Sequence, residues 1–222
     1  MIKLLSVKTR LPGTTREAFR RHYEERHVPL GLGFIDRFRW RKYIRNHVVA
    51  VHAGQVDFDC LTEFWFAGPE DQESTRVFAA SPEFRVLDQD DERFLDVTRR
   101  LSFPLEERLV VGTRPAHDAV GTRRFAAIFS CPDPTGVGAF ARSISAEVKR
   151  IASKQSLAGA RLSLDLRATS GPRPSELAAI VSTWSAPGAL PVRLSDWIDH
   201  EPAAEVELEV VETPADRLWS PN

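Results

Sequence analysis

One order of structural elements occurs twice along the 222 residues of this chain, and this repeat limits the fold more than any other feature. In the first copy, runs of strand-forming residues alternate with segments whose apolar residues follow a helical period. A helix is expected from Thr14, because Thr14 and Thr15 are good N-cap residues. The expected strands cover residues 2–9, 37–52, 60–67 and 97–111, and the expected helices cover 14–26, 69–80 and 82–91.

The second copy begins near Arg123 and has the same outline. Apolar residues at helical spacing, among them Phe140, Ile144 and Val148, predict a helix over residues 135–155. Strands are expected over 123–131, 160–168, 176–184 and 205–212, and a short helix over 194–199. Both copies therefore have the order βαββαβ, which is typical of ferredoxin-like domains with helices on one face of a four-stranded sheet.

This duplication predicts an α+β fold in which two tandem ferredoxin-like βαββαβ repeats pack their sheets into one α+β barrel. Because each sheet has helices on one face only, the two bare faces can be buried against each other. We expect a first domain at 1–111, a linker at 112–121 and a second domain at 122–214. The barrel would be a pseudo-dimer within one chain, which also leaves room for a homodimer, and its interior is the expected place for a small-molecule pocket.

The charge and the cysteine content exclude several classes of function. The formal net charge is −1, and the charged residues, 27% of the chain, form no long run of one sign, so neither nucleic acid nor a membrane is an expected partner. Cys60 and Cys131 are the only cysteines, so no disulfide framework or structural zinc site is expected. The sequence has no apolar segment of membrane-spanning length and no signal-peptide pattern, so we expect a cytoplasmic protein.

The segment HYEERHVPL, residues 22–30, places two histidines beside two glutamates, as some metal-binding motifs do. On an α-helix, a spacing of five residues turns His22 and His27 about 140° apart, so a shared metal is not expected. The helix is expected to end before Pro29, because the residue before a proline avoids the helical region. His22 would then lie on the surface, and His27 would be either a cation at the helix C-terminus or a catalytic group.

Tyr43, Arg45 and His47 alternate along one expected strand and therefore share one of its faces. That face would combine an acid, a base and an anion-binding group, since histidine can take up and release a proton near neutral pH. We expect it to point into the barrel, because packing it under the helices would bury Arg45 at a high cost. The alternative is that Tyr43 and His47 form a hydrogen-bonded pair in the core.

Other acidic residues are weaker candidates. Glu63 and Trp65 share a strand face with Asp59. Two carboxylates so close together can raise one pKa and create a general acid, although a solvated or paired strand edge is the simpler interpretation. The acidic run from Asp88 to Glu92 is interpreted as a solvated helix face.

Four segments of the first half, taken in order, resemble the EthD family of the dimeric α+β barrel superfamily. They are MIKLLSVKTRLPGTTREAFRRHYEERHVPL with its E-x-H-x-P signature, RKYIRNHVV, DFDCLTEFWF and SPEFRVLDQDDERFLD. The resemblance extends from Met1 to about Glu107. The second half has the same outline without the histidine signatures, so it is similar to a degenerate repeat of the same domain.

The resemblance implies an enzyme that needs no cofactor, since most members of the family have none. Its assigned members include methylmuconolactone isomerases and polyketide cyclases, dehydratases and decarboxylases. It therefore implies a lyase or isomerase that acts on a small aromatic, lactone or polyketide-like compound by acid–base catalysis through His27, His47 and Tyr43. The candidates for substrate binding are Arg45, Glu63 and Trp65, together with Cys60, which the resemblance adds.

Two other functions remain open at this point. One is a haem-binding or O₂-using, monooxygenase-like barrel, because other dimeric α+β barrels bind haem through a histidine. The other is a non-catalytic accessory protein that binds a small molecule without transforming it.

Overall fold

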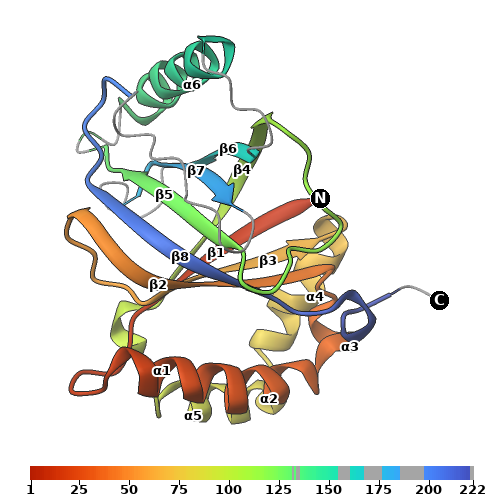
Figure 1. Ribbon diagram of the computed structural model, residues 1–222. Helices are drawn as coiled ribbons and strands as arrows, with labels where there is room; N and C mark the ends of the chain where they lie inside the picture. The colour runs from red at the N-terminus through yellow and green to blue at the C-terminus, as the bar shows by residue number, and fades with distance from the viewer. Residues whose placement is uncertain (132, 134–135, 155–160, 168–176, 186–197, 221–222) are drawn as a thin grey trace. The chain divides into compact units, whose positions relative to one another are not determined.

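The computed structural model describes residues 1–131, 133, 136–154, 161–167, 177–185 and 198–220 (Figure 1). Its elements follow the order that the sequence predicts. The first copy of the repeat contains β1 (Ile2–Lys8), α1 (Arg16–His22), the π-helix η1 (Tyr23–His27), α2 (Val28–Leu32), α3 (Ile35–Phe38), β2 (Lys42–Gly54), β3 (Cys60–Phe66), α4 (Pro69–Ala79), the 3-10 helix η2 (Pro82–Phe84), α5 (Arg85–Asp91), the 3-10 helix η3 (Val97–Arg99) and β4 (Leu101–Val111).

The second copy contains β5 (Arg123–Phe129), α6 (Val137–Lys154), β6 (Arg161–Arg167), β7 (Ala179–Ser185) and β8 (Ala204–Glu212), and the 3-10 helix η5 (Ala215–Arg217) follows it. The short helix expected over 194–199 falls mostly on residues outside the described part of the chain. None of the helices among the described residues is long and apolar enough to cross a lipid bilayer.

The strands confirm the predicted fold class. Their order is β1-β3-β2-β8-β5-β7-β6-β4, and they close into a barrel. Followed around the barrel, this order gives β4-β1-β3-β2 for the first copy and β8-β5-β7-β6 for the second, so the two copies have the same internal arrangement. Each recorded pair of strands is antiparallel, from β1 with β3 to β6 with β7.

Contacts between residues divide the chain into two compact units that differ from the sequence repeats. The first unit comprises residues 1–47, 57–102 and 212–222, and the second comprises 48–56 and 103–211. The domain boundaries expected from the sequence remain a prediction, since a repeat and a contact unit are different divisions of the chain.

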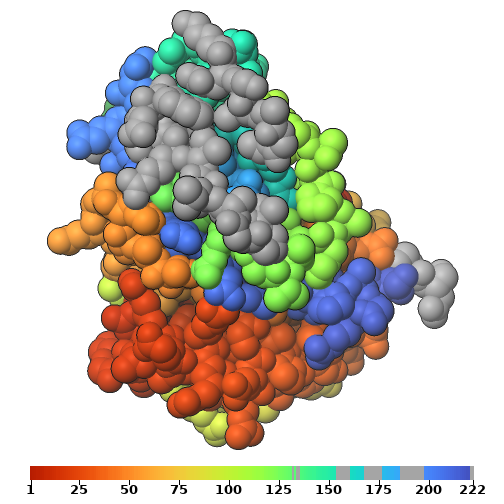
Figure 2. Space-filling view, viewed as in Figure 1, coloured from red at the N-terminus to blue at the C-terminus, as the bar shows by residue number. Residues whose placement is uncertain are grey.

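The core of the first unit lies between one face of β1 and β3 and the helices that cover it (Figure 1). In the antiparallel register Leu4 lies opposite Phe64 and Ser6 opposite Thr62, so these residues share the helix-covered face. Aromatic rings fill much of the space, including those of Phe19, Tyr23, Phe38, Trp40, Tyr43, Phe66 and Phe94. The helices α1 and α2 form a continuous outer surface over this core (Figure 2).

The first helical segment is longer than the sequence predicts. It begins as expected, with the Thr15 hydroxyl accepting a hydrogen bond from the Ala18 amide at 3.1 Å, but it passes Pro29 and ends at Leu32. The expectation that this helical segment would end before Pro29 was wrong, because the turn before the proline is a π-turn, which is wider than an α-helical turn. The Val28 amide bonds to the Tyr23 carbonyl, five residues back, and Pro29 then occupies the first turn of α2, where a missing N–H group is tolerated.

The second unit has a core of its own. Ile144, Val148 and Ile151 of α6 are buried against β-strand residues such as Leu164 and Val181, as the helical spacing predicts. In the same unit Arg124 and Asp165 form an ion pair at 3.1 Å with both side chains fully buried.

Candidate active site

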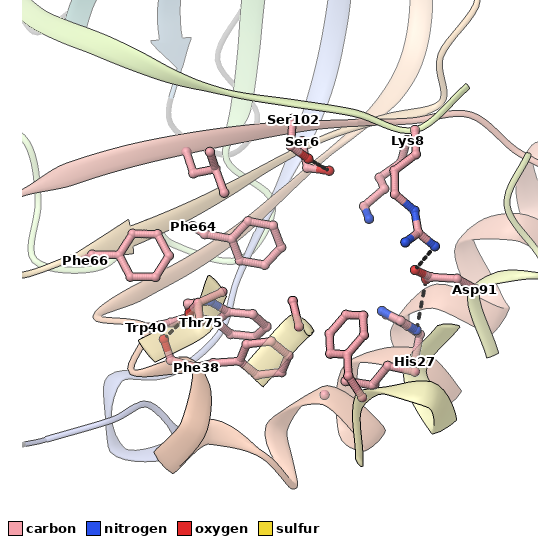
Figure 3. Close-up of a pocket in the computed structure, with 16 residues that line it drawn as sticks. Ser6, Lys8, His27, Phe38, Trp40, Phe64, Phe66, Thr75, Asp91 and Ser102 are labelled. Carbon is pink, nitrogen blue, oxygen red and sulfur yellow. Dashed lines mark hydrogen bonds and ion pairs between the residues drawn. The ribbon is translucent and has the colours of Figure 1, made fainter. Parts of the chain in front are cut away.

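A cavity of about 180 Å³ lies within the first unit, between the helix-covered face of the sheet and the helices (Figure 3). An apolar cavity of about 150 Å³ already takes up benzene, so this one can hold a molecule with a single ring. One end is aromatic, with Phe38, Trp40, Phe64 and Phe66 gathered there (Figure 3), and the apolar residues Leu4, Phe84 and Leu87 also line the cavity. The sequence led us to expect the pocket inside the barrel, whereas this cavity lies on the other side of the sheet.

The opposite end of the cavity is polar. It is lined by Lys8 and Ser6 of β1, His27 of η1, Asp91 of α5, and Arg100 and Ser102 near the start of β4. The Ser102 hydroxyl donates a hydrogen bond to the Ser6 oxygen at 2.9 Å, which leaves the Ser6 hydroxyl proton free for another acceptor. Arg100 binds Asp91 at 2.8 Å and Asp88 at 3.0 Å.

His27 is positioned for acid–base chemistry at this polar end. Its Nδ1 atom lies 3.0 Å from an Asp90 oxygen and 3.5 Å from an Asp91 oxygen. A carboxylate accepts only, so Nδ1 carries the proton and donates it, which leaves the lone pair on Nε2. Figure 3 shows that second ring nitrogen turned toward the cavity. The arrangement therefore presents a proton acceptor to any bound molecule.

The electrostatic surroundings keep His27 neutral. Burial lowers the pKa of His27 below its usual value, and the nearby Lys8 charge lowers it further, against the opposing effect of Asp91 and Asp90. A neutral imidazole can act as a base at neutral pH. Once protonated, the ring would be stabilised by the two carboxylates beside it.

His22 shares Asp90 with His27, which corrects the expectation that the two histidines point apart. His22 Nε2 lies 3.0 Å from the second Asp90 oxygen. The prediction assumed a regular α-helix, but η1 is a π-helix, whose wider turn brings residues five apart to the same side. His22 is also less exposed than expected, at 26% of its side chain, and its ring stacks on Phe94 at 4.7 Å.

Lys8 is the second charged group that the cavity exposes. The residue is 9% exposed, and Figure 3 shows its amine directed into the cavity. No described side chain lies within ion-pairing or hydrogen-bonding distance of the ammonium group. Burial lowers the pKa of Lys8, although the Asp91 charge partly opposes this.

The face of β2 that carries Tyr43, Arg45 and His47 packs against the helices, so the expectation that it would point into the barrel was wrong. Arg45 binds Glu24 of η1 at 2.8 Å, and His47 Nε2 lies 2.6 Å from the other oxygen of that carboxylate. Arg45 also donates hydrogen bonds to the Tyr43 carbonyl and the Thr213 hydroxyl. Glu24 offsets the burial cost on which the prediction rested, since one carboxylate partners both cations.

His47 and Tyr43 are buried and are not among the residues that line the cavity. Burial disfavours the charged form of His47, but the Cys60 thiol and the Glu24 carboxylate outweigh it and raise its pKa to about 9. Burial likewise opposes ionisation of Glu24, yet the hydrogen bonds from His47 and Arg45 hold its pKa at about 2. The pair is therefore charged at neutral pH.

Tyr43 donates a hydrogen bond to the Tyr23 oxygen at 3.3 Å, and burial raises the pKa of Tyr43 well above its usual value. Tyr23 links this group to the cavity, because the centre of its ring lies 5.9 Å from that of His47 and 5.5 Å from that of His27. These contacts match the hydrogen-bonded core alternative more closely than a direct contact with substrate.

The remaining candidates for substrate binding lie on different faces of the sheet. Glu63 and Trp65 are on the face of β3 away from the helices, where Glu63 pairs with Lys3 at 3.2 Å and accepts a hydrogen bond from the Trp65 indole at 3.1 Å. Cys60 is buried on the helix-covered face, with its sulfur 3.6 Å from the Thr62 hydroxyl. None of the three lines the cavity. Asp59 is paired with Arg10 and Arg16.

Lys8, Asp90, Asp91 and Arg100 were not predicted from the sequence as site residues. The acidic run was interpreted as solvated, but Asp90 and Asp91 are only 6% and 5% exposed. Their spacing from Leu87 carried the signal, because residues three and four positions after a buried helical residue lie on its face. Among the described residues, no three His, Cys, Asp or Glu side chains are placed to hold a metal ion.

The fold and the cavity together define the class of protein, an α+β barrel of two ferredoxin-like repeats, like the dimeric α+β barrel proteins. More narrowly, residues 11–98 match the family model described as the EthD domain, so the chain carries an EthD domain in its first half. That match includes His27 and the Asp90–Asp91 pair. No curated protein matches the sequence.

Solved structures show the same fold over nearly the whole chain at low sequence identity. A protein from Fusobacterium nucleatum subsp. nucleatum ATCC 25586, named a "putative monooxygenase", is 9% identical, with 94% of this chain and 91% of that chain covered and a TM-score of 0.51. One of the same name from Lactobacillus acidophilus NCFM is 9% identical, with coverages of 95% and 93% and a TM-score of 0.48. A "putative chlorite dismutase" is 12% identical, covers 95% of each chain and has a TM-score of 0.47.

Proposed function

We propose that this protein is a cofactor-independent lyase or isomerase that moves a proton within a small aromatic, lactone or polyketide-like substrate bound in the cavity of the first unit. The observation that carries the proposal is the setting of His27, whose Nδ1 is held by two carboxylates while its Nε2 is turned toward the cavity. A carboxylate that orients a histidine in this way is a recurring device of enzymes that use the ring as a base.

The residues at the polar end support a balanced proton transfer. The Nε2 lone pair of His27 takes a proton from a carbon next to a substrate carbonyl, and the electron pair of the C–H bond moves toward the carbonyl oxygen. The negative charge develops at the polar end of the cavity, where the positive charge of the Lys8 ammonium stabilises it. The imidazolium then returns the proton to another carbon in an isomerisation, or to a departing hydroxide in a dehydration.

His47 and Tyr43 remain in the proposal in an indirect role. Glu24 and Tyr23, their partners, belong to the same π-helix as His27, so the two residues hold the segment that carries the base. Substitution at either position should therefore weaken turnover less than substitution of His27. This ordering separates a base in the cavity from groups that act through another residue.

The test is proton exchange at substrate carbon. Wild-type protein and His27→Gln are incubated in D₂O with a panel of lactones and β-keto aromatic compounds, and deuterium incorporation is followed by mass spectrometry. The wild type should catalyse exchange with at least one compound, and His27→Gln should lower the rate about 10²- to 10⁴-fold. His47→Gln and Tyr43→Phe should have smaller effects.

The control is His52→Gln, which removes a histidine of the second unit whose partner is Glu207. It should exchange substrate at the wild-type rate. If His27→Gln kept the wild-type rate while remaining folded by circular dichroism, His27 would not be the base and the proposal would fail.

An O₂-using monooxygenase is the second candidate, and the neighbour with a TM-score of 0.51 carries that name. At 9% identity this likeness bears on the fold alone. Haem would not fit the cavity, since about 180 Å³ is well below the roughly 300–1,000 Å³ of pockets for drug-sized ligands. Substrate-dependent O₂ consumption by the purified protein would favour this candidate over the lyase or isomerase.

The proposal also includes a homodimer of the whole chain, in addition to the two repeats that the barrel of one chain already joins. Its mass in solution, measured by light scattering, distinguishes it from a monomer.

A further inference from the structure

Lys8 gives the cavity a chemical preference. Its side chain is buried in the wall of the cavity, and its amine is directed into the open space. An ammonium group in such surroundings normally has a carboxylate partner, because burying a charge alone is costly. Lys3, the other lysine of β1 on the opposite face, has such a partner in Glu63 at 3.2 Å. For Lys8, no partner exists among the described residues.

The carboxylate near Lys8, that of Asp91, already has other partners. Asp91 binds Arg100 through one oxygen at 2.8 Å, and its other oxygen lies 3.5 Å from His27. Asp90 binds His22 and His27. Asp91 therefore acts on Lys8 only through its charge, and the N–H groups of the Lys8 ammonium have no acceptor among the described side chains, so they can bind an incoming anion. The Ser6 hydroxyl proton, next to it on β1, can serve the same anion.

The other end of the cavity limits the rest of the ligand. Phe38, Trp40, Phe64 and Phe66 form its wall, and flat rings pack well against such a surface. The cavity volume of about 180 Å³ allows one ring with small substituents.

We propose that the cavity binds an aromatic or similarly flat one-ring carboxylate, with the ring among the phenylalanines and the carboxylate on Lys8 and Ser6. This deepens the proposed function by adding the class of substrate, and it rests on that function only in using the same cavity. The carboxylate then anchors the molecule within reach of His27, which lines the same polar end.

Binding without turnover tests the assignment. Benzoate, its neutral counterpart benzamide and the ringless anion acetate are titrated into wild-type protein by calorimetry. Benzoate should bind about tenfold more tightly than either of the other two, because only benzoate has both the charge and the ring. Equal binding of benzoate and benzamide, or of benzoate and acetate, would overturn the proposal, as would the absence of benzoate binding.

The variant Lys8→Met removes the charge and keeps a long apolar side chain. It should lower the affinity for benzoate about tenfold and leave that for benzamide unchanged, while Lys8→Arg should retain the preference for benzoate. Lys149→Met, a change at an exposed lysine of α6, is the matched control and should behave as the wild type. A Lys8→Met protein that still prefers benzoate would contradict the assignment. The wild-type comparison remains decisive even if this variant does not fold.

His27→Gln separates the two proposals. It should bind benzoate as the wild type does, because His27 is not the anchor. Loss of deuterium exchange with intact benzoate binding supports both proposals. Intact exchange in His27→Gln, with benzoate binding lost in Lys8→Met, rejects the base and keeps the anion site.

Discussion

His22 and His27 bind the two oxygens of one carboxylate, that of Asp90, each at 3.0 Å. His27 lines the cavity, whereas His22 lies beside a separate surface groove lined by Arg21, Arg26 and Arg93. The three side chains therefore form a continuous hydrogen-bonded connection from the cavity to the exterior of the first unit. A π-turn in the helix is what brings a pair five residues apart to a single partner.

This shared carboxylate predicts that His22 affects the titration of His27. In His22→Phe, the new ring can still stack on Phe94, but the N–H group that donates a hydrogen bond to the Asp90 carboxylate is lost. More of that negative charge then acts on His27, so the pKa of His27 should rise toward its usual value. An NMR titration of the His27 ring measures the change.

His52→Phe, in the second unit, is the control and should leave the titration of His27 as it is. An identical midpoint for His27 in the wild type and in His22→Phe would show that Asp90 does not couple the rings.

The carboxylate of Asp90 should also determine which nitrogen of His27 carries the proton. In Asp90→Asn an amide replaces an acceptor, and it can donate to Nδ1, which favours the tautomer with the proton on Nε2. The ¹⁵N shifts of the His27 ring should therefore change toward that tautomer. Deuterium exchange into substrate should fall at least about tenfold, since Nε2 of His27 then carries a proton and cannot accept one from the substrate.

Asp88→Asn is the matched control, because Asp88 is a half-exposed neighbour on the same helix that binds Arg100. Its His27 shifts should equal those of the wild type. Unchanged shifts in Asp90→Asn would mean that Asp91 alone orients the ring.

Most of the fold was predictable from the sequence because it depends on local patterns. The run of strand-forming residues over 60–67 and the helical spacing of Ile144, Val148 and Ile151 each gave an element close to its observed bounds. The order of the elements then restricted the topology, since βαββαβ units pair their strands in few ways.

The arrangement of the site depended on features that such patterns do not carry. A π-turn has no sequence rule comparable to an N-cap, so the geometry of His22 and His27 was misjudged. The direction of Arg45 was misjudged because Glu24 is distant in sequence and its pairing with Arg45 was not foreseen. Lys8 at the end of β1 looks like an ordinary strand residue, and only the tertiary structure shows that its ammonium group has no partner among the described side chains.

The His47–Glu24 pair predicts a pH dependence of stability. The pKa of His47 is about 9 in the folded protein against about 6.5 for a free histidine, so the folded state holds the proton more tightly. The stabilisation is complete below about pH 6.5 and is lost as the pH rises through 9. From this shift it amounts to about 3 kcal/mol. The measurement is urea unfolding of the wild type and His47→Gln between pH 6 and 10.

The difference in unfolding free energy between these two proteins isolates His47, because other groups titrate equally in both. It should be largest near pH 6 and shrink toward pH 10. A gap that stays constant over this range would show that His47 is not held as a cation. His52→Gln, at a more exposed site, should differ little from the wild type at any pH.

At Gly54, the last residue of β2, adding a single methyl group should greatly lower the stability of the protein. Gly54 has a φ of 67°, and a Cβ atom there would lie 2.0 Å from the Ala203 carbonyl oxygen, within the second unit. Gly13 also has a positive φ, 85°, but a Cβ there would meet nothing within 4 Å.

Gly13→Ala should therefore cost about 1 kcal/mol of stability from the backbone alone. Gly54→Ala should cost about 3 kcal/mol or more, because the backbone at Ala203 must also move. Chemical unfolding of both variants gives the difference, and equal losses would show that the close approach to Ala203 does not constrain residue 54.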